Sequence, residues 1–246
     1  MIDQNLLMRR ALRYACDQHK LDTRNLAHLN FETRNALEEY VIEIADDMRY
    51  NQLKYFRPFE HQLKFFATGN NDRRGILAAN RIGKTVSTCS ETAIHLTGNY
   101  PAWWKGKRFD KPITAMVAGE GWQQVALVLQ AELLGTNDIK ITEQIGTGFI
   151  PRDSIVFDTM RNDGANCLGV EIRHVSGSNS YLLFANYTQE VRQMQGFKLN
   201  IAVFDEQPPD DFFSEIVTRT ATTQGMVMCS FTPLKGLNGL VSKFWH

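Results

Sequence analysis

Hydrophobic residues return at helical spacing through the first fifty positions of the chain. In two stretches they recur every three or four positions: Met8, Leu12 and Ala15, then Leu37, Val41, Ile44 and Met48. Side chains at this spacing share one face of a helix. We therefore predict a small helical subdomain, a lid or appendage, over residues 1–54, ahead of a larger domain over residues 55–246.

Short apolar runs and helical stretches alternate through the larger domain. The apolar runs predict strands at 75–78, 113–118, 170–175, 181–186, 200–206 and 226–233, and the helical stretches lie at 86–96 and 123–134. The runs at 170–175 and 181–186 flank a Ser-Gly-Ser-Asn turn, which favours an antiparallel pair. Elsewhere strands alternate with helices, which is typical of a parallel sheet. The expected fold class is α/β, with a mostly parallel sheet flanked by helices.

A phosphate-binding loop is the main chemical signal, in the sequence Ala-Ala-Asn-Arg-Ile-Gly-Lys-Thr between the first strand and its helix. Backbone N–H groups of such a loop face the phosphates, Lys84 adds a positive charge, and the Thr85 hydroxyl can bind Mg²⁺. ATP or a relative, with Mg²⁺, is the expected ligand. The expected binding residues are Ala79, Asn80, Arg81, Ile82, Gly83, Lys84 and Thr85. Ala78 replaces the first glycine of the usual pattern, so a glycine-rich turn without phosphate is the alternative.

Two adjacent carboxylates end the apolar run at 200–206. Successive strand residues point to opposite sides, so Asp205 and Glu206 can have different roles. Asp205 would serve the magnesium ion and its waters, and Glu206 would orient and deprotonate the attacking water. An acidic pair that begins a solvated loop is the alternative, because most carboxylates are exposed.

Two further segments carry groups suited to a nucleotide site. Ser230 and Thr232 end the last apolar run, where a hydroxyl could contact the γ-phosphate or its water and couple hydrolysis to the next element. Pro58 predicts a helix start with Gln62 one turn inside, and a glutamine amide can both donate to and accept from an adenine edge. A core strand and an ordinary amphipathic helix are the respective alternatives.

Composition limits the function classes. The 246 residues are 43% hydrophobic, and the 27 basic and 27 acidic residues give a net charge of +0, which argues against wrapping nucleic acid through bulk charge. Local basic spots remain, with an ordinary solvated surface as the default interpretation: Arg9-Arg10, Arg73-Arg74 and Lys105 to Arg108 with Lys111. No apolar stretch reaches membrane-spanning length, and the first residues lack a signal-peptide pattern.

Cysteines and histidines give no sign of a zinc site. Four scattered cysteines and six histidines lack ligand spacing, so we expect reduced, mostly buried thiols and no metal besides the Mg²⁺ that accompanies nucleotide.

In combination, these segments resemble the large terminase subunit of tailed bacteriophages, from about residue 55 to the C-terminus. The matching features are the loop with an internal arginine, Asp205-Glu206, Ser230-x-Thr232-Pro233, Pro58-x-x-x-Gln62, Tyr100-Pro-x-Trp-Trp, Gly146-Thr-Gly-Phe-Ile-Pro151 and Gln195-Gly196. Each is common alone and specific only in combination. The resemblance implies a P-loop ATPase fold of the ASCE, RecA-like class.

The resemblance also implies a role: an ATP-hydrolysing motor that drives double-stranded viral DNA into a procapsid. Its implied partners are the DNA, the portal protein, the small terminase subunit and further copies in a ring, in the host cytoplasm and away from membranes. By the same resemblance, Lys84, Thr85, Asp205 and Glu206 take the roles given above. Gln62 reads adenine, Tyr55 or Phe56 stacks on the base, and Arg81 is the basic residue inside the loop.

The arginine that stabilises the transition state stays open at this point. Arg81 within the same subunit is the preferred candidate, and Arg192 and Arg219 could reach a neighbouring subunit. The family's C-terminal nuclease domain has no room after residue 246, so no nuclease activity is expected. The alternatives are a helicase-like ATPase, which would need a second RecA-like domain, and a nucleotide-binding assembly switch without turnover.

Overall fold

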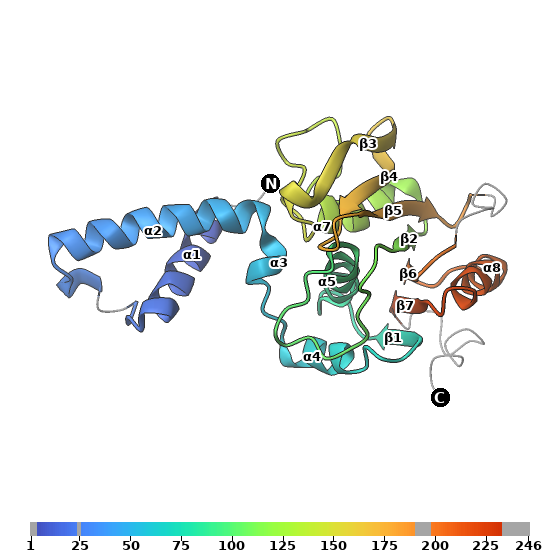
Figure 1. Ribbon diagram of the computed structural model, residues 1–246, viewed down its shortest axis with the longest axis horizontal. Coiled ribbons are helices and arrows are strands. Elements are labelled where there is room, and N and C mark those ends of the chain that lie inside the picture. Colours follow the sequence, from blue (N-terminus) through green and yellow to red (C-terminus); the bar gives the residue numbers. More distant parts are fainter. Residues whose placement is uncertain (1–3, 24–25, 190–197, 233–246) are drawn as a thin grey trace.

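A seven-stranded sheet forms the centre of the computed structural model, which describes residues 4–23, 26–189 and 198–232 (Figure 1). The strand order across the sheet is β1-β7-β6-β2-β5-β4-β3. In chain order the strands are β1 (Arg73–Leu77), β2 (Thr114–Gly119), β3 (Ile155–Asp163), β4 (Asn166–Arg173), β5 (Asn179–Asn186), β6 (Ile201–Asp205) and β7 (Met226–Phe231).

Strands β1, β7, β6, β2 and β5 pair in parallel, which confirms the predicted sheet type. The register sets Asp205 beside Ser230, and Leu77 beside Phe231. The carboxyl ends of these strands therefore meet at one edge, where ligands bind in open α/β sheets.

Strands β3 and β4 extend the sheet in the antiparallel sense beyond β5. The pair β4–β5 confirms the hairpin predicted around residues 176–179. The sequence pattern does not predict β3, because its side chains are mostly exposed or half-buried and its pairing with β4 shifts register. Such a strand lacks a clean apolar alternation and takes its conformation from its neighbour.

One face of the sheet is covered by α5 (Lys84–Thr97), the helix that follows the phosphate loop. Twelve of its residues are buried, although many are polar. Several hydroxyls donate to carbonyls of the same helix, as Thr92 does to Thr88 at 2.7 Å and Thr97 to Ala93 at 2.7 Å. These bonds remove the cost of burying the hydroxyl groups.

The other face carries α8 (Asp210–Ala221), a helix that the sequence pattern does not predict. Phe212, Phe213 and Ile216 bury its apolar side against β6 and β7. Its first turn holds Asp210 and Asp211, which suit the positive end of the helix dipole. On the α5 side, the predicted helix at 123–134 consists of α6 (Trp122–Gln124), a π-helical segment Val125–Gln130 and α7 (Ala131–Leu134).

The N-terminal helices project from the sheet as an arm (Figure 1). They are α1 (Gln4–His19), the 3₁₀ turn Leu26–His28 and α2 (Phe31–Tyr50), and the short α3 (Gln52–Tyr55) joins them to the core, where Leu53 is buried. Their apolar sides form a separate cluster that contains the residues predicted for the helical face. Asn30 caps α2 by accepting from the Thr33 amide at 2.8 Å. Helix α4 (Glu60–Ala67) then leads to β1, and a second 3₁₀ turn, Arg152–Ser154, precedes β3.

A buried ion pair joins β1 to α5 and corrects one prediction. Arg74, expected in a basic surface spot, is buried and donates both terminal nitrogens to the Glu91 carboxylate. His95 lies beside Glu91, and burial lowers the pKa of its imidazole. The pair connects the two elements on either side of the phosphate loop.

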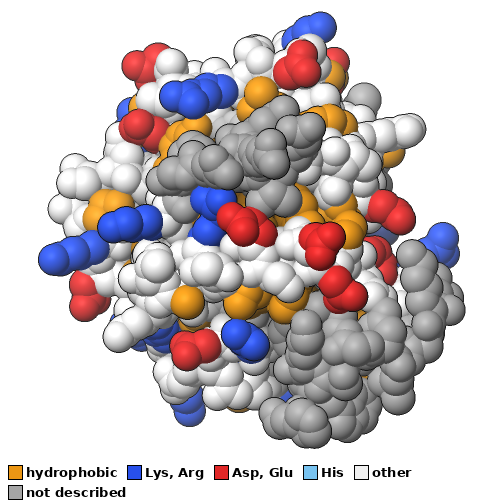
Figure 2. Space-filling model, turned by 90° about the vertical axis from the view of Figure 1, so that its right-hand side faces the viewer, with side chains coloured by type: hydrophobic (Ala, Val, Ile, Leu, Met, Phe, Trp, Pro, Cys, Tyr) orange, Lys and Arg blue, Asp and Glu red, His pale blue; other side chains and the backbone are white. Residues whose placement is uncertain are grey.

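Charges of both signs are interspersed on the molecular face that Figure 2 shows, in keeping with the net charge of +0. The four cysteines are free and buried, as predicted. Within the described residues, none of the helices is both long and apolar enough to traverse a lipid bilayer.

Candidate nucleotide-hydrolysis site

The loop between β1 and α5 has a backbone that only particular residues adopt easily. Gly83, which precedes α5, has φ of 82°, and Arg81 has φ of 66°. A Cβ on Gly83 would also lie 2.9 Å from Nε2 of Gln62. The conformation at position 83 therefore favours glycine, and a larger residue would also have to displace the Gln62 amide.

Lys84 reaches back over this loop from the first turn of α5. Its Nζ donates to the carbonyl oxygens of Ala78 at 2.9 Å and Ala79 at 3.1 Å, and to Oγ1 of Thr232 at 3.0 Å. The residue is only 8% exposed. Its charge is thus held at the mouth of the loop, next to the helix N-terminus where an anion binds most easily.

The Asp205 carboxylate accepts hydrogen bonds from hydroxyl groups on two other segments. Thr85 Oγ1 donates to Asp205 Oδ1 at 2.9 Å, and Ser230 Oγ donates to the same oxygen at 2.8 Å. Burial raises the pKa of the Asp205 carboxyl, and these two hydrogen bonds oppose the rise. The phosphate loop, the acidic strand and the last strand therefore meet at one carboxylate.

Glu206 follows Asp205 in a conformation that is costly for glutamate, with φ of 61°. Its amide donates to the Ser230 carbonyl at 2.7 Å. Its carboxylate accepts from the Thr232 amide at 3.1 Å and lies 3.1 Å from the Thr232 hydroxyl. The turn directs the carboxylate toward the same edge as Lys84.

Thr232 lies between the phosphate loop and Glu206. Besides Lys84 and Glu206, its hydroxyl lies 2.8 Å from Oδ1 of Asn80. One hydroxyl proton serves either Asn80 or Glu206 at a time, while its oxygen accepts from Lys84. Ser230 and Thr232 are thus both at the site.

Gln62 also contacts the loop, but its amide is already engaged. The residue is 2% exposed, its Oε1 accepts from the Phe59 amide at 2.9 Å, and its Nε2 donates to the Gly83 carbonyl at 3.3 Å. Helix α4 begins at Glu60, two residues later than Pro58 predicted. Gln62 connects α4 to the loop, and its amide is not open to a base in this arrangement.

The structure places Tyr55 and Phe56 away from the loop, which corrects the prediction that either stacks on a base. Tyr55 is 9% exposed, donates to Asp47 at 2.5 Å and packs against Tyr14 in the N-terminal arm. Phe56 packs against three other aromatic rings: Phe66, Trp103 and Phe149. Both rings are used in packing.

Phe59 and His61 form the aromatic group that does lie beside the loop. Their rings stack with centroids 5.8 Å apart, and His61 Nε2 is 2.8 Å from the Ile82 carbonyl oxygen. Phe59 is 70% exposed. The sequence offers a signal for this, because Phe59 lies in the same aromatic segment as Tyr55 and Phe56, but spacing alone does not distinguish the three rings.

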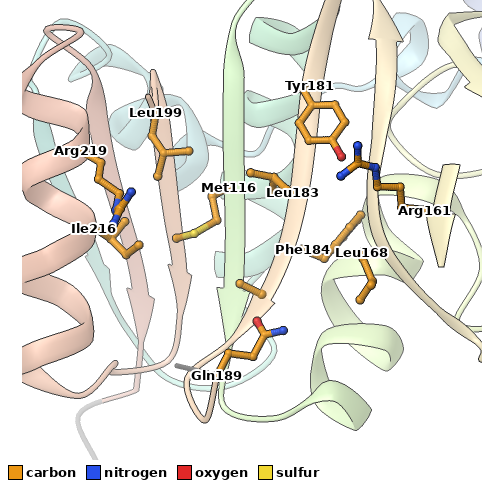
Figure 3. A pocket seen from close by; sticks show the side chains of 11 residues that line it. Met116, Arg161, Leu168, Tyr181, Leu183, Phe184, Gln189, Leu199, Ile216 and Arg219 are labelled. Atoms are coloured by element: carbon orange, nitrogen blue, oxygen red, sulfur yellow. The ribbon is translucent and has the colours of Figure 1, made fainter. Parts of the chain in front are cut away.

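The candidate arginines lie in different places. Arg81 is exposed on the phosphate loop. Arg219, on α8, has a side chain 12% exposed and pairs with Glu215 at 2.6 Å. Figure 3 shows it beside a cavity of about 190 Å³ near Met116 and Ile216, lined by the sheet face opposite α5. The structure does not bring Arg219 to the loop of its own subunit, and Arg192 lies outside the described residues.

Sequence reasoning misses two residues of the site. Gln124 Nε2 lies 3.3 Å from Asp205 Oδ2, and the Tyr187 hydroxyl lies 2.9 Å from the carbonyl oxygens of both Asp205 and Glu206. Neither belongs to a local motif, since Gln124 reaches the site from the end of α6 and Tyr187 from the residue after β5.

The donor set fits magnesium bound to a triphosphate. Thr85 and Asp205 supply a hydroxyl and a carboxylate side by side, and Mg²⁺ on a nucleotide takes its other ligands from phosphate and water. In the described ranges, His, Cys, Asp and Glu residues do not gather in threes as a protein-only metal centre would require.

Comparison with known proteins identifies the family. Residues 76–245 match the family model described as "Terminase large subunit, T4likevirus-type, N-terminal". The chain is 30% identical over 239 residues to the terminase large subunit of Salmonella phage P22, covering 89% of this chain and 47% of that protein. It therefore spans about half the length of this curated relative.

The fold has solved counterparts as well. The large terminase of a thermophilic bacteriophage superposes with a TM-score of 0.50 at 15% identity, over 71% of this chain and 39% of that one. A second structure of that protein, in complex with ADP, gives 0.47 at 14% identity over the same shares. The first superposition supports the fold alone, and the sequence matches carry the family assignment: the chain belongs to the T4-like-virus type of terminase large subunits.

Proposed function

We propose that this chain is the ATP-hydrolysing motor domain of a terminase that moves double-stranded DNA into a procapsid. The observation that carries the proposal is the meeting of Thr85, Lys84, Asp205 and Glu206 at one sheet edge. A triphosphate with its magnesium ion needs this combination of hydroxyl, ammonium and carboxylates.

The phosphate loop and Lys84 bind and orient the β- and γ-phosphates. Loop amides at the helix N-terminus face the anion, and the Lys84 ammonium adds a fixed positive charge. Magnesium, when bound, neutralises charge on the phosphate oxygens, and Thr85 and Asp205 are the residues that would hold it. Because Lys84 contacts Ala78, Ala79 and Thr232 in this arrangement, nucleotide binding must exchange some of these contacts for phosphate oxygens.

Glu206 is the general base in this proposal. Its side chain is less buried than that of Asp205. A general base has to be accessible to the water molecule whose proton it accepts. Thr232 binds its carboxylate through the amide and lies next to Lys84. A change at the γ-phosphate would therefore reach the segment after β7 through a single side chain, which is the coupling role expected for Thr232.

The base end of the nucleotide would lie toward α4. Phe59 offers an exposed ring that is backed by His61, and His61 is bound to the loop carbonyl of Ile82. An aromatic face of this kind stacks on a purine without distinguishing its edge. Adenine stacking therefore falls to Phe59 in this proposal, and Gln62 fixes the distance between α4 and the loop.

Assembly and DNA contacts rest on the family alone. By the same family membership we propose that the chain forms a ring on the portal protein, acts with the small terminase subunit and works in the host cytoplasm. The arginine that stabilises the transition state is proposed to be Arg81 of the same subunit, or Arg192 or Arg219 of a neighbouring one. Zero net charge suits a motor whose DNA contacts are local and shared among several copies.

Mg²⁺-dependent ATP hydrolysis by the purified chain, measured with and without portal protein and duplex DNA, tests the proposal. We expect Lys84→Ala to lose binding or turnover, and Glu206→Gln to bind ATP and lose hydrolysis. Lys140→Ala, at an exposed position outside the site and the basic spots, serves as the control and should behave as the wild type. Hydrolysis at the wild-type rate in Lys84→Ala would refute the site, and ATP binding without any turnover would favour an assembly switch.

A further inference from the structure

Tyr187 lies directly beneath the turn that carries the two carboxylates. It is the first residue after β5 and is 9% exposed. Its hydroxyl oxygen lies 2.9 Å from the Asp205 carbonyl, 2.9 Å from the Glu206 carbonyl and 3.2 Å from the Ala118 carbonyl at the end of β2. A phenol has one proton to donate, so these three carbonyls share a single donor.

The surroundings hold this phenol in position. The Tyr187 amide donates to the Gly119 carbonyl at 2.9 Å, which continues the pairing of β5 with β2. The ring packs edge-on against Phe212 of α8, with centroids 5.4 Å apart at 63°. Burial raises the pKa of the Tyr187 phenol well above its usual value, so the group stays protonated and can donate.

Glu206 needs a hydrogen-bond partner such as this phenol because its backbone is in the left-handed conformation, with φ of 61°. A left-handed conformation is unfavourable for an L-residue other than glycine and persists only where neighbouring contacts enforce it. On one side of the residue, its amide donates to the Ser230 carbonyl at 2.7 Å. On the other side, its carbonyl accepts from the Tyr187 hydroxyl. Ser230 and Tyr187 therefore hold the residue from both ends.

We propose that Tyr187 is a positioning residue for Glu206, and that its hydroxyl maintains the left-handed turn that keeps the carboxylate facing the phosphate loop. The inference rests on the proposed function, since Glu206 is taken as the general base. Tyr187 acts through backbone carbonyls and needs no contact with the nucleotide. Nothing in its neighbourhood in the sequence marks it as part of the site.

Tyr187→Phe tests the proposal because it removes only the hydroxyl and keeps the packed ring. In the full chain we expect kcat for ATP to fall about 10- to 100-fold, as a misplaced reacting group would cause. The Kd for a non-hydrolysable ATP analogue should change less than about two-fold, since Lys84 and the loop are untouched. Tyr100→Phe is the matched control: its hydroxyl accepts from the Phe109 amide at 2.6 Å, outside the site, and kcat should stay unchanged.

Hydrogen exchange supplies a readout that does not require hydrolysis. Exchange of the Glu206 amide should accelerate about ten-fold or more in Tyr187→Phe, while amides in the middle of β6 keep the wild-type rate. The same change in a Glu206→Gly background should accelerate it much less, because glycine adopts φ near 60° without help.

These measurements separate the two hypotheses. A wild-type chain that does not hydrolyse ATP refutes the proposed function, while the exchange experiment still decides the role of Tyr187. Unchanged Glu206 exchange in Tyr187→Phe overturns the inference, and so does equal acceleration in the two backgrounds. An unchanged kcat beside faster exchange also overturns it, because the hydroxyl would then stabilise the turn without serving the base.

Discussion

Thr85 and Asp205 lie 120 positions apart in the chain, yet the threonine hydroxyl donates to the aspartate carboxylate at 2.9 Å. This contact joins the phosphate loop on β1–α5 to the acidic end of β6. Strand β7 lies between β1 and β6 and adds the Ser230 hydroxyl to the same carboxylate oxygen. Parallel strands with carboxyl ends at one edge explain why three distant segments share a site.

Replacement of Thr85 tests its proposed role at magnesium. Thr85→Ala removes the hydroxyl that would bind the ion, and we expect kcat with Mg²⁺ and ATP to fall about 100-fold or more, equivalent to about 2.7 kcal/mol. Thr85→Ser keeps the hydroxyl and should retain most activity. Steady-state ATPase assays over a range of Mg²⁺ concentrations measure both variants. Equal losses in the two would point to packing of the methyl group instead.

Asp205→Asn should stabilise the fold while it weakens magnesium-dependent binding. Because burial raises the folded-state pKa of Asp205, ionisation of this group disfavours the folded state. The gain in unfolding free energy should be largest above the folded pKa, shrink as the pH falls through it, and vanish below about 4, near the unfolded value. Affinity for the Mg²⁺–nucleotide should fall about 10- to 100-fold.

Urea unfolding at several pH values, with binding measured by calorimetry, checks the Asp205 prediction. Asp158→Asn, at an exposed position of β3, is the control for the loss of one negative charge. A variant that is less stable than the wild type at neutral pH would show that the Asp205 carboxylate contributes more through its hydrogen bonds than it loses by burial.

Gly83→Ala should disturb both the fold and the nucleotide site. Alanine at φ of 82° costs about 1–2 kcal/mol, and its Cβ would lie 2.9 Å from the Gln62 amide nitrogen. We expect a lower melting temperature and loss of ATP-analogue binding. Gly121→Ala is the matched control, because Gly121 has φ of −156° and open space around the Cβ position. Identical behaviour of the two variants would contradict the account of the loop.

The buried pair of Arg74 and Glu91 predicts a strongly non-additive double substitution. Arg74→Met leaves the Glu91 charge buried without its partner and should cost about 3–5 kcal/mol of unfolding free energy. Arg74→Met with Glu91→Met removes both charges and should lie within about 1 kcal/mol of the wild type. Denaturant unfolding of the wild type, Arg74→Met, Glu91→Met and the double variant measures the coupling, and additive losses would show that the two charges act independently.

The sequence by itself determined the parallel sheet and the polar segments that meet at its edge. The phosphate loop, Asp205-Glu206 and Ser230-x-Thr232 are recognisable because the polar residues of each motif directly adjoin a strand or helix with a clear apolar pattern. The carboxyl ends of parallel strands must then share an edge. The local sequence pattern and the topology of a parallel sheet were therefore sufficient to predict that these motifs lie together.

Tertiary structure alone decided which side chains complete the site. Tyr55 and Phe59 both lie in one aromatic segment, but the first packs into the N-terminal arm and the second stays exposed beside the loop. Arg74 became a buried partner of Glu91, and Tyr187 reached the acidic turn from the end of β5. These outcomes depend on contacts between residues far apart in the chain, and the spacing of residues along one segment carries no record of what packs against it.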